Sequence, residues 1–193
     1  MQIVRVVLAG LVVLLYAGIV CANENRFVFS GMTATDTNTG LEWTREVDFG
    51  EPQWASRLPG KNTGDADVFD VVNELNRQMY AGHNDWRVPS FEELKTLAMY
   101  AYDMGCNGGY GAPQRAAFFN KLGFKYVKPD WYWSRDKHAD VDGNTNLVWA
   151  VNMRSSEIGA LWAGFPSPVW PVRGNIKNSY SNTKFYYFPD SAK

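Results

Sequence analysis

Two helix patterns lie in the middle of this chain with strand-like segments on both sides, and this order limits the fold to a mixed one. In residues 65–80, apolar side chains recur at steps of three and four, which places them on one face of a helix. These side chains are Val68, Val71, Val72, Leu75 and Met79. In the second pattern Ser90 follows Pro89 and stands three residues before Glu93, as in a capping box at a helix start. We expect the buried side of this second helix to contain Leu94, Leu97 and Ala98.

The segments on either side of the helices are typical of strands. Residues 27–43 indicate a strand, an Asn-Thr-Gly turn and a second strand. After a short helical stretch before Gly123, four further runs predict strands: WYWS, NLVWAVNM, GALWAG and VWPVR. Asp142 and Gly143 form a hairpin turn signal between the first two of these. The sequence therefore predicts an α+β fold with two main helices packed on a mixed or antiparallel sheet, and long loops such as residues 45–64.

The first 22 residues have the layout of a secretory signal peptide. A positive charge at Arg5 precedes an uncharged apolar run over residues 6–20, and Cys21 and Ala22 then stand where a signal peptidase reads. We expect cleavage after Ala22 and export to the periplasm or the outside of the cell. Two alternatives stay open: a lipid attached to Cys21, and an uncleaved leader that anchors the protein in the membrane.

Beyond the leader, the length suits one domain over residues 23–174, followed by a tail over 175–193. Cys106 is then the single cysteine of the mature chain, which excludes an internal disulfide; we interpret it as a small buried hydrophobe, with an intermolecular bridge as the alternative. The chain carries 19 Lys and Arg against 20 Asp and Glu, without long blocks of one sign. Binding to nucleic acid is therefore not expected.

Five motifs, in order and spacing, resemble the Lcl C-terminal domain family of exported bacterial domains. The resemblance spans roughly residues 32–174, and the motifs are TDTNTGLEW, DWRVPSFEEL, WYWSRD, VWAVNM and WPVRG. It implies a fold similar to C-type lectins and to the formylglycine-generating enzymes. Because the founding member is the C-terminal part of a collagen-like adhesin, it also implies binding to sulfated glycans and assembly as a trimer.

The sequence departs from the family pattern in ways that limit this carry-over. Family members often have one cysteine in the first helix and another in the last strand motif, where Pro171 stands here. The sequence before the domain also has no collagen-like repeat, which puts trimer assembly in doubt. We expect Trp86, Arg87 and Pro89 to be structural, with a buried ring and with the guanidinium held by a carboxylate or by backbone carbonyls. Trp43, Trp133 and Ser134 are interpreted in the same way.

Catalytic and metal-binding patterns are weak in this sequence. His138, Asp140 and Asp142 partly match a calcium loop, but Trp149 stands where the twelfth-position Glu is needed, so a solvated hairpin is the better interpretation. The formylglycine-generating relatives use a cysteine pair, and one mature thiol does not supply it. An enzyme related to them is the weaker alternative, and we expect neither a catalytic site nor a cofactor nor a metal.

Basic and aromatic side chains interleave between the last helical stretch and the following strand, as a binding surface for an acidic ligand would need. Cations beside aromatic rings suit a sulfated or acidic sugar. We therefore expect a non-enzymatic binding module for such glycans at the cell envelope or surface, acting in adhesion. The alternative is a structural or protein-interaction subunit of an envelope assembly. The candidate ligand-binding residues are Lys121, Phe124, Lys125, Tyr126, Lys128, Trp131, Arg135 and Lys137.

Overall fold

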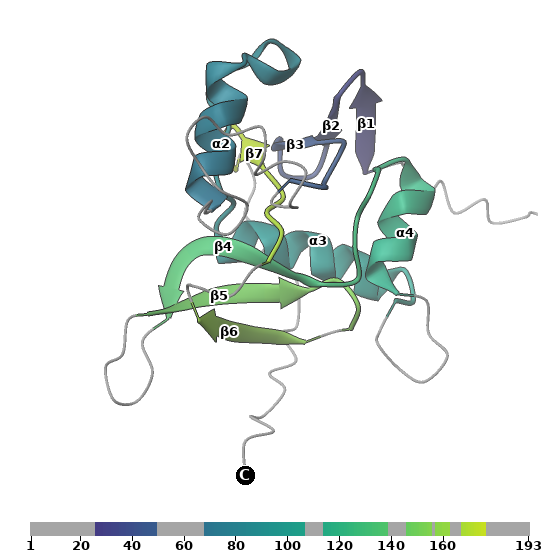
Figure 1. The fold of residues 1–193 in the computed structure, drawn as a ribbon. Coiled ribbons are helices and arrows are strands. Elements are labelled where there is room, and N and C mark those ends of the chain that lie inside the picture. The colour runs from purple at the N-terminus through teal and green to yellow at the C-terminus, as the bar shows by residue number, and fades with distance from the viewer. Residues whose placement is uncertain are drawn as a thin grey trace, which may run out of the picture.

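A computed structural model describes residues 26–49, 68–106, 114–138, 146–155, 157–162 and 167–176. Within these residues the chain forms three α-helices, one short 3-10 helix and seven strands, and the strands make two antiparallel sheets (Figure 1). The predicted α+β class is confirmed at this level. None of the helices in this part of the chain is long and apolar enough to cross a membrane.

The first sheet joins the two ends of the domain. Its strand order is β1-β2-β3-β7, every pair being antiparallel. The predicted turn over residues 38–40 is present, and Gly40 takes a φ of 75° there while its N–H donates to the carbonyl of Asp36 at 2.7 Å. The strand expected before that turn is broken at Gly31 into two strands. The four strands are β1 (Phe27–Ser30), β2 (Thr33–Asp36), β3 (Glu42–Thr44) and β7 (Val172–Arg173).

The second sheet contains β4 (Trp131–His138), β5 (Leu147–Asn152) and β6 (Ile158–Trp162), in that order. The predicted strand pairing of β4 with β5 is confirmed, with an irregularity between Trp133 and Lys137. The turn expected at residues 142–143 lies outside the described residues.

The first helix, α2 (Val68–Arg77), buries the predicted apolar stripe except for its last member. Val68, Val71, Val72 and Leu75 are buried, whereas the prediction for Met79 is wrong. The chain has left the helix by then: Met79 has a φ of 51°, and its side chain is exposed ahead of the 3-10 helix η1 (Tyr80–Gly82).

The second helix, α3 (Phe91–Asp103), begins with the predicted capping box. The Ser90 hydroxyl accepts a hydrogen bond from the Glu93 amide at 3.2 Å, and the Ser90 amide donates to the Glu93 carboxylate at 2.7 Å. The Asp136 carboxylate on β4 accepts from the Phe91 amide at 2.6 Å and places a negative charge at the positive end of the helix. The helix start is thus fixed both by its own sequence and by the sheet.

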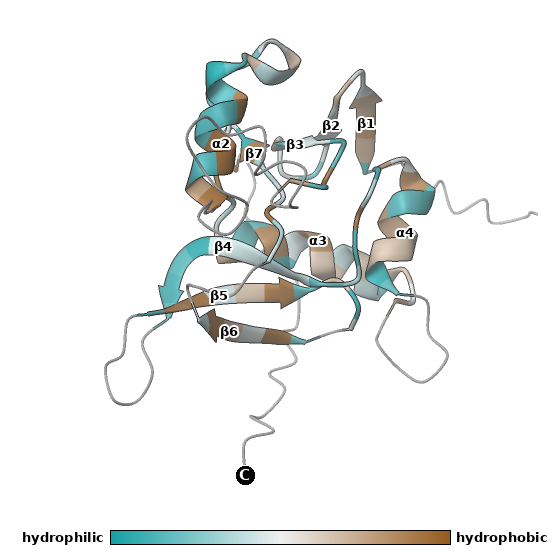
Figure 2. Ribbon diagram, viewed as in Figure 1, coloured by the Kyte–Doolittle hydropathy of each residue, from teal (hydrophilic) through white to brown (hydrophobic). Residues whose placement is uncertain are grey.

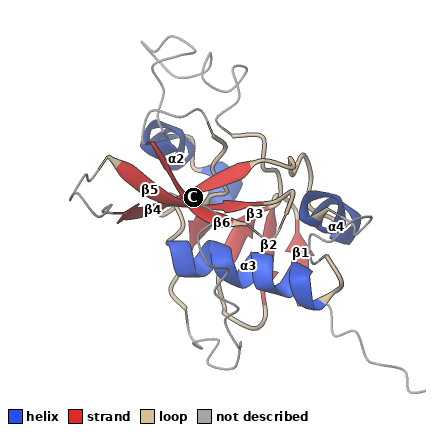
Figure 3. Ribbon diagram, turned by 90° about the horizontal axis from the view of Figure 1, so that it is seen from below, coloured by secondary structure: helices blue, strands red, loops and turns tan. Residues whose placement is uncertain are grey.

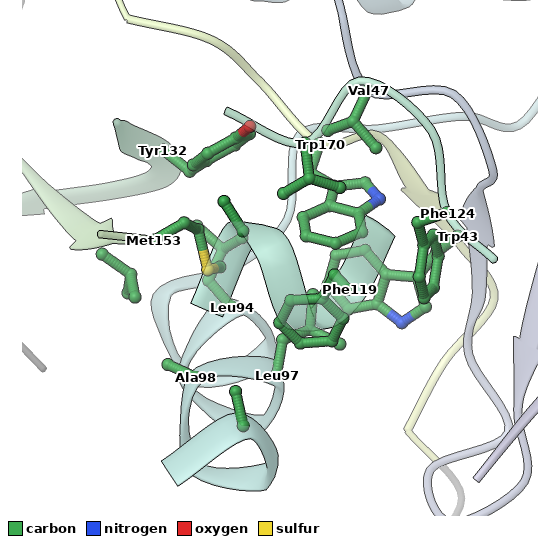
Figure 4. Close-up of a cluster of buried hydrophobic side chains, with 14 of the residues drawn as sticks. Trp43, Val47, Leu94, Leu97, Ala98, Phe119, Phe124, Tyr132, Met153 and Trp170 are labelled. Carbon is green, nitrogen blue, oxygen red and sulfur yellow. The ribbon is translucent and has the colours of Figure 1, made fainter. Parts of the chain in front are cut away.

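The core lies between the two sheets and α3, and α4 (Arg115–Leu122) closes one side of it. Figure 4 shows Trp170 at the centre of this cluster, and Figure 3 shows α3 lying along one side of the strands. The Trp170 ring makes edge contacts with Trp43, Phe119 and Phe124, and its indole N–H donates to the carbonyl of Thr44 at 3.1 Å. A second apolar cluster packs α2 against Phe49, Trp86, Val88, Trp133 and Val169.

Candidate functional site

The Trp86–Arg87 turn is a structural junction, as the sequence predicts. Trp86 is buried, and its indole N–H donates to the carbonyl of Tyr80 at 2.9 Å. The Arg87 guanidinium donates to both carboxylate oxygens of Glu93 and to the carbonyl of Gly174. The other residues interpreted as structural are buried as well: Trp43, Trp133 and Ser134.

One candidate ligand-binding residue, Phe124, belongs to the core. Its side chain is only 2% exposed, and its ring centroid lies 4.9 Å from that of Trp170 and 5.0 Å from that of Phe27. The expectation that Phe124 contacts a ligand is therefore wrong. Burial of its large apolar ring outweighs any role at the surface, because transfer of that ring out of water stabilises the fold.

The other seven candidates fall into two groups. Lys121, Lys125, Tyr126 and Lys128 come from the end of α4 and the segment after it, whereas Trp131, Arg135 and Lys137 lie on β4. Figures 1 and 3 place α4 and the end of β4 at opposite sides of the molecule. From Trp131 to Lys137 an extended strand covers roughly 20 Å.

The β4 group does not form a single surface. Arg135 and Lys137 are exposed near the end of the strand, but the Trp131 ring packs over Gly159, where an added Cβ would lie 3.2 Å from it. The structure therefore does not bring the eight predicted residues into one binding face.

The first group is built around residues 125–128, which we call the Tyr126 turn. The Lys125 amide donates to the carbonyl of Arg45 at 2.8 Å, and the Val47 amide donates to the carbonyl of Lys125 at 3.0 Å. On the other side the Asn120 side chain at the end of α4 binds both backbone groups of Val127, at 2.8 and 3.0 Å. The residues before and after Tyr126 are thus fixed to two different parts of the fold.

Tyr126 itself is held in the left-handed region, with a φ of 63°, and its side chain is 59% exposed. For a residue with a Cβ this conformation costs about 1–2 kcal/mol, and such strain persists only where the surroundings impose it. The turn therefore holds an aromatic ring on the surface at a cost to stability. Nothing in Lys-Tyr-Val indicates this conformation, because the usual signals are Gly, Asn and Asp.

Most charged side chains around the Tyr126 turn are positive: Lys121 and Lys125 are exposed, and Lys128 is half-buried. Lys125 pairs with Glu46 at 3.1 Å across two exposed side chains, a contact that contributes little to stability. Lys121 is exposed in the last turn of α4, and the Lys128 amide donates to the Tyr132 hydroxyl at 2.8 Å. Besides Glu46, the exposed Asp130 is an acidic side chain close in sequence to this turn.

The reactive groups singled out in the sequence lie elsewhere. Cys106 is buried, as predicted; burial raises the pKa of its thiol, and the Arg115 guanidinium offsets part of that rise. His138 ends β4 with its ring 4.4 Å from Trp149, whereas Asp140 and Asp142 lie outside the described residues. Within the described ranges no group of three or more His, Cys, Asp or Glu side chains is placed to hold a metal ion.

Comparison with known proteins agrees with the motif order. The family model described as the Lcl C-terminal domain matches residues 32–173. No curated protein matches the chain. Of the elements that the structure describes, the matched segment covers the three α-helices, the second sheet and all strands of the first sheet except β1, together with the junction at Arg87 and the Tyr126 turn. The chain therefore belongs to the Lcl C-terminal domain family.

Proposed function

We propose that this chain is an exported, non-enzymatic binding module that takes a sulfated or acidic glycan at the Tyr126 turn, in adhesion at the cell envelope or surface. One observation carries the proposal: Tyr126 is strained and exposed between two fixed neighbours. Because the backbone that carries this ring is already fixed, no loop has to be ordered when a sugar stacks on it, and binding loses less conformational entropy.

The lysines supply the second part of the recognition. Sulfate and carboxylate groups accept charge-assisted hydrogen bonds, which are stronger than neutral ones. Lys121 and Lys125 project from the exposed ends of fixed segments, and Lys128 lies two residues past Tyr126. An aromatic face for the sugar ring beside cations for its acidic groups is the pairing that a sulfated glycan requires.

The proposal extends to the fold and to the compartment. We propose a C-type-lectin-like arrangement with long loops, in keeping with the family, and export through the leader to the periplasm or the outside of the cell. A non-enzymatic role is supported by Cys106, because a buried thiol with a raised pKa is a poor nucleophile. No cofactor is part of the proposed function.

Retention on immobilised heparin, a sulfated glycan, tests the proposal. We expect the processed protein to be retained at low salt and released as the salt concentration rises, because the contacts are ionic. Replacing Lys125 and Lys128 by Ala should remove retention, and Tyr126→Ala should weaken it. Lys137→Ala is the matched control, since Lys137 is an exposed lysine at the far end of β4.

The outcomes of this experiment distinguish glycan binding at the Tyr126 turn from a structural or protein-interaction role. Retention that survives the Lys125 and Lys128 replacements, or that falls equally in Lys137→Ala, contradicts the assigned surface. A protein that does not bind at low salt leaves the alternative, a structural or protein-interaction subunit of an envelope assembly.

A further inference from the structure

The outer edge of β6 is a second surface that the glycan proposal does not use. β6 is the last strand of the sheet β4-β5-β6, and no strand within the described residues pairs with its other side (Figure 1). An unpaired strand edge presents a row of N–H and C=O groups that pairs readily with another chain. Natural edges are usually protected by charges or proline, but the segment Ile158–Trp162 contains neither.

The hydrogen bonds show which residues of β6 face outward. The Asn152 amide donates to the carbonyl of Glu157 at 3.1 Å, and in an antiparallel pair the bonded positions recur at every second residue. Gly159 and Leu161 therefore bond to β5, opposite Ala150 and Val148. The backbone groups of Ile158, Ala160 and Trp162 must point away from the sheet.

The same three residues also share one face of the sheet, because side chains alternate along a strand. Two of them are large and exposed: Ile158 at 39% and Trp162 at 60%. Figure 2 shows β6 as one of the more hydrophobic strands. On this face α3 packs on β4 and β5, and Phe91 stacks on Trp149 at 4.9 Å, whereas Ile158 and Trp162 of β6 stay exposed.

We propose that a second copy of this chain pairs with β6 through its own β6, antiparallel, about a two-fold axis between the two Ala160 residues. In this register Ile158 stands opposite Trp162 of the second copy, and Ala160 stands opposite its counterpart. Every outward N–H then meets an outward C=O, since all the paired positions are outward-facing ones. The exposed Ile158 and Trp162 side chains become cross-strand neighbours on one face.

Charge and symmetry also fit a second copy. A two-fold axis makes the same patch serve both partners, so a self-complementary strand is sufficient. The segment Ile158–Trp162 carries no charge, and the antiparallel register keeps the two Glu157 carboxylates at opposite ends of the paired strands, roughly 20 Å apart. No like charges therefore meet at the axis.

The proposed interface between the two β6 strands is small, so the dimer should be weak. Two strands and four large side chains bury less than the roughly 1,200 Å² of a stable interface, so the dimer should depend on protein concentration. Such a dimer would present two Tyr126 turns and bind a repeating ligand with higher avidity than one copy. The pairing itself does not rest on the glycan proposal, and its tests use no glycan.

Sedimentation of the processed protein over a range of concentrations is the first test. We expect a monomer–dimer equilibrium that Trp162→Lys weakens by about tenfold or more, which corresponds to 1.4 kcal/mol or more. Ala160→Pro should act similarly, because it removes an outward N–H while leaving the bonds to β5 intact. The matched control is Val28→Lys, the same kind of change at a 55% exposed position of β1, the edge strand of the other sheet.

Cross-linking tests the register. Opposed residues in a bonded antiparallel pair have Cα atoms about 5.5 Å apart, within disulfide range, so Ala160→Cys should form an intermolecular disulfide on oxidation. Ile158→Cys should not, since its two copies would lie roughly 13 Å apart. A protein that is monomeric at all concentrations overturns the proposal, as does a trimer, a control that dissociates equally, or cross-linking at position 158 without cross-linking at position 160.

Discussion

Arg87 and Glu93 form a two-point ion pair, in which two guanidinium nitrogens each lie 2.7 Å from one carboxylate oxygen. The Glu93 side chain is almost fully buried, and the same carboxylate also accepts the Ser90 amide at the start of α3. Arg87 in turn donates to the carbonyl of Gly174, just beyond β7. One pair thus connects the turn at Trp86, the second helix and the last strand.

Removing Arg87 should destabilise the fold strongly. Arg87→Ala leaves the buried Glu93 carboxylate without its counter-charge, and we expect a loss of about 2–4 kcal/mol, between the cost of a lost charged hydrogen bond and that of a broken buried pair. Urea unfolding measures it. Lys125→Ala is the control, because its pair with Glu46 is exposed and should contribute less than about 1 kcal/mol. Equal losses in both variants would contradict this account.

The same carboxylate predicts how stability depends on pH. Burial raises the pKa of Glu93, but the hydrogen bonds from Arg87 and Ser90 outweigh it and hold the pKa below the ordinary value of 4.5. A carboxyl group with a lowered pKa in the folded state adds stability above its unfolded pKa and loses it as the pH falls through the folded pKa.

We therefore expect the free energy of unfolding to fall on acidification below about pH 4.5, partly through Glu93. Glu93→Gln removes this titration, so its difference from the unchanged protein should shrink between pH 6 and pH 3. Urea unfolding at each pH measures that difference. A gap that stays constant over this range would show that Glu93 does not titrate abnormally.

Replacing Gly123 by Ala should crowd a neighbouring side chain, and the same change at Gly82 serves as a control without that crowding. It ends α4 with a φ of 124°, and an added Cβ would lie 3.2 Å from the Phe29 ring. Gly123→Ala should therefore combine backbone strain with crowding and cost about 2–3 kcal/mol. Gly82 has a φ of 83°, and an added Cβ there would meet no atom within 4 Å. Gly82→Ala should therefore lower the free energy of unfolding by about 1 kcal/mol, through backbone strain alone. Thermal unfolding of both variants measures the two losses. A larger loss for Gly82→Ala than for Gly123→Ala would contradict the prediction.

The local parts of this fold could be predicted from sequence because their signals lie within a few residues. The capping box at Ser90 and the stripe from Val68 to Leu75 depend on spacing along one helix. Met79 has the spacing that would continue this stripe, but the helix ends before it. Its exposure follows from the backbone leaving the helix, which spacing does not reveal.

The candidate site could be predicted only in part, because long-range packing decides which side chains meet. Phe124 and Tyr126 look alike in sequence, two aromatic residues on either side of Lys125. Phe124 packs against Trp170 in the core. Tyr126 stays at the surface, because the backbone hydrogen bonds of Lys125 and Val127 fix the turn that carries it. Neither contact has a local signal, so the sequence predicts the composition of the surface but not its shape.

Strain at Tyr126 makes a prediction in which stability and binding change in opposite directions. Tyr126→Gly should relieve the left-handed strain and raise the free energy of unfolding by about 1 kcal/mol, while heparin retention falls because the ring is lost. Tyr126→Ala keeps the strain and loses the ring, so it should bind as poorly without the gain in stability. Thermal unfolding and heparin retention of both variants, measured together, distinguish a ring held for binding from an ordinary turn. If the glycine variant is less stable than the alanine variant, the conformation is not strained, and the turn loses the observation on which its proposed role depends.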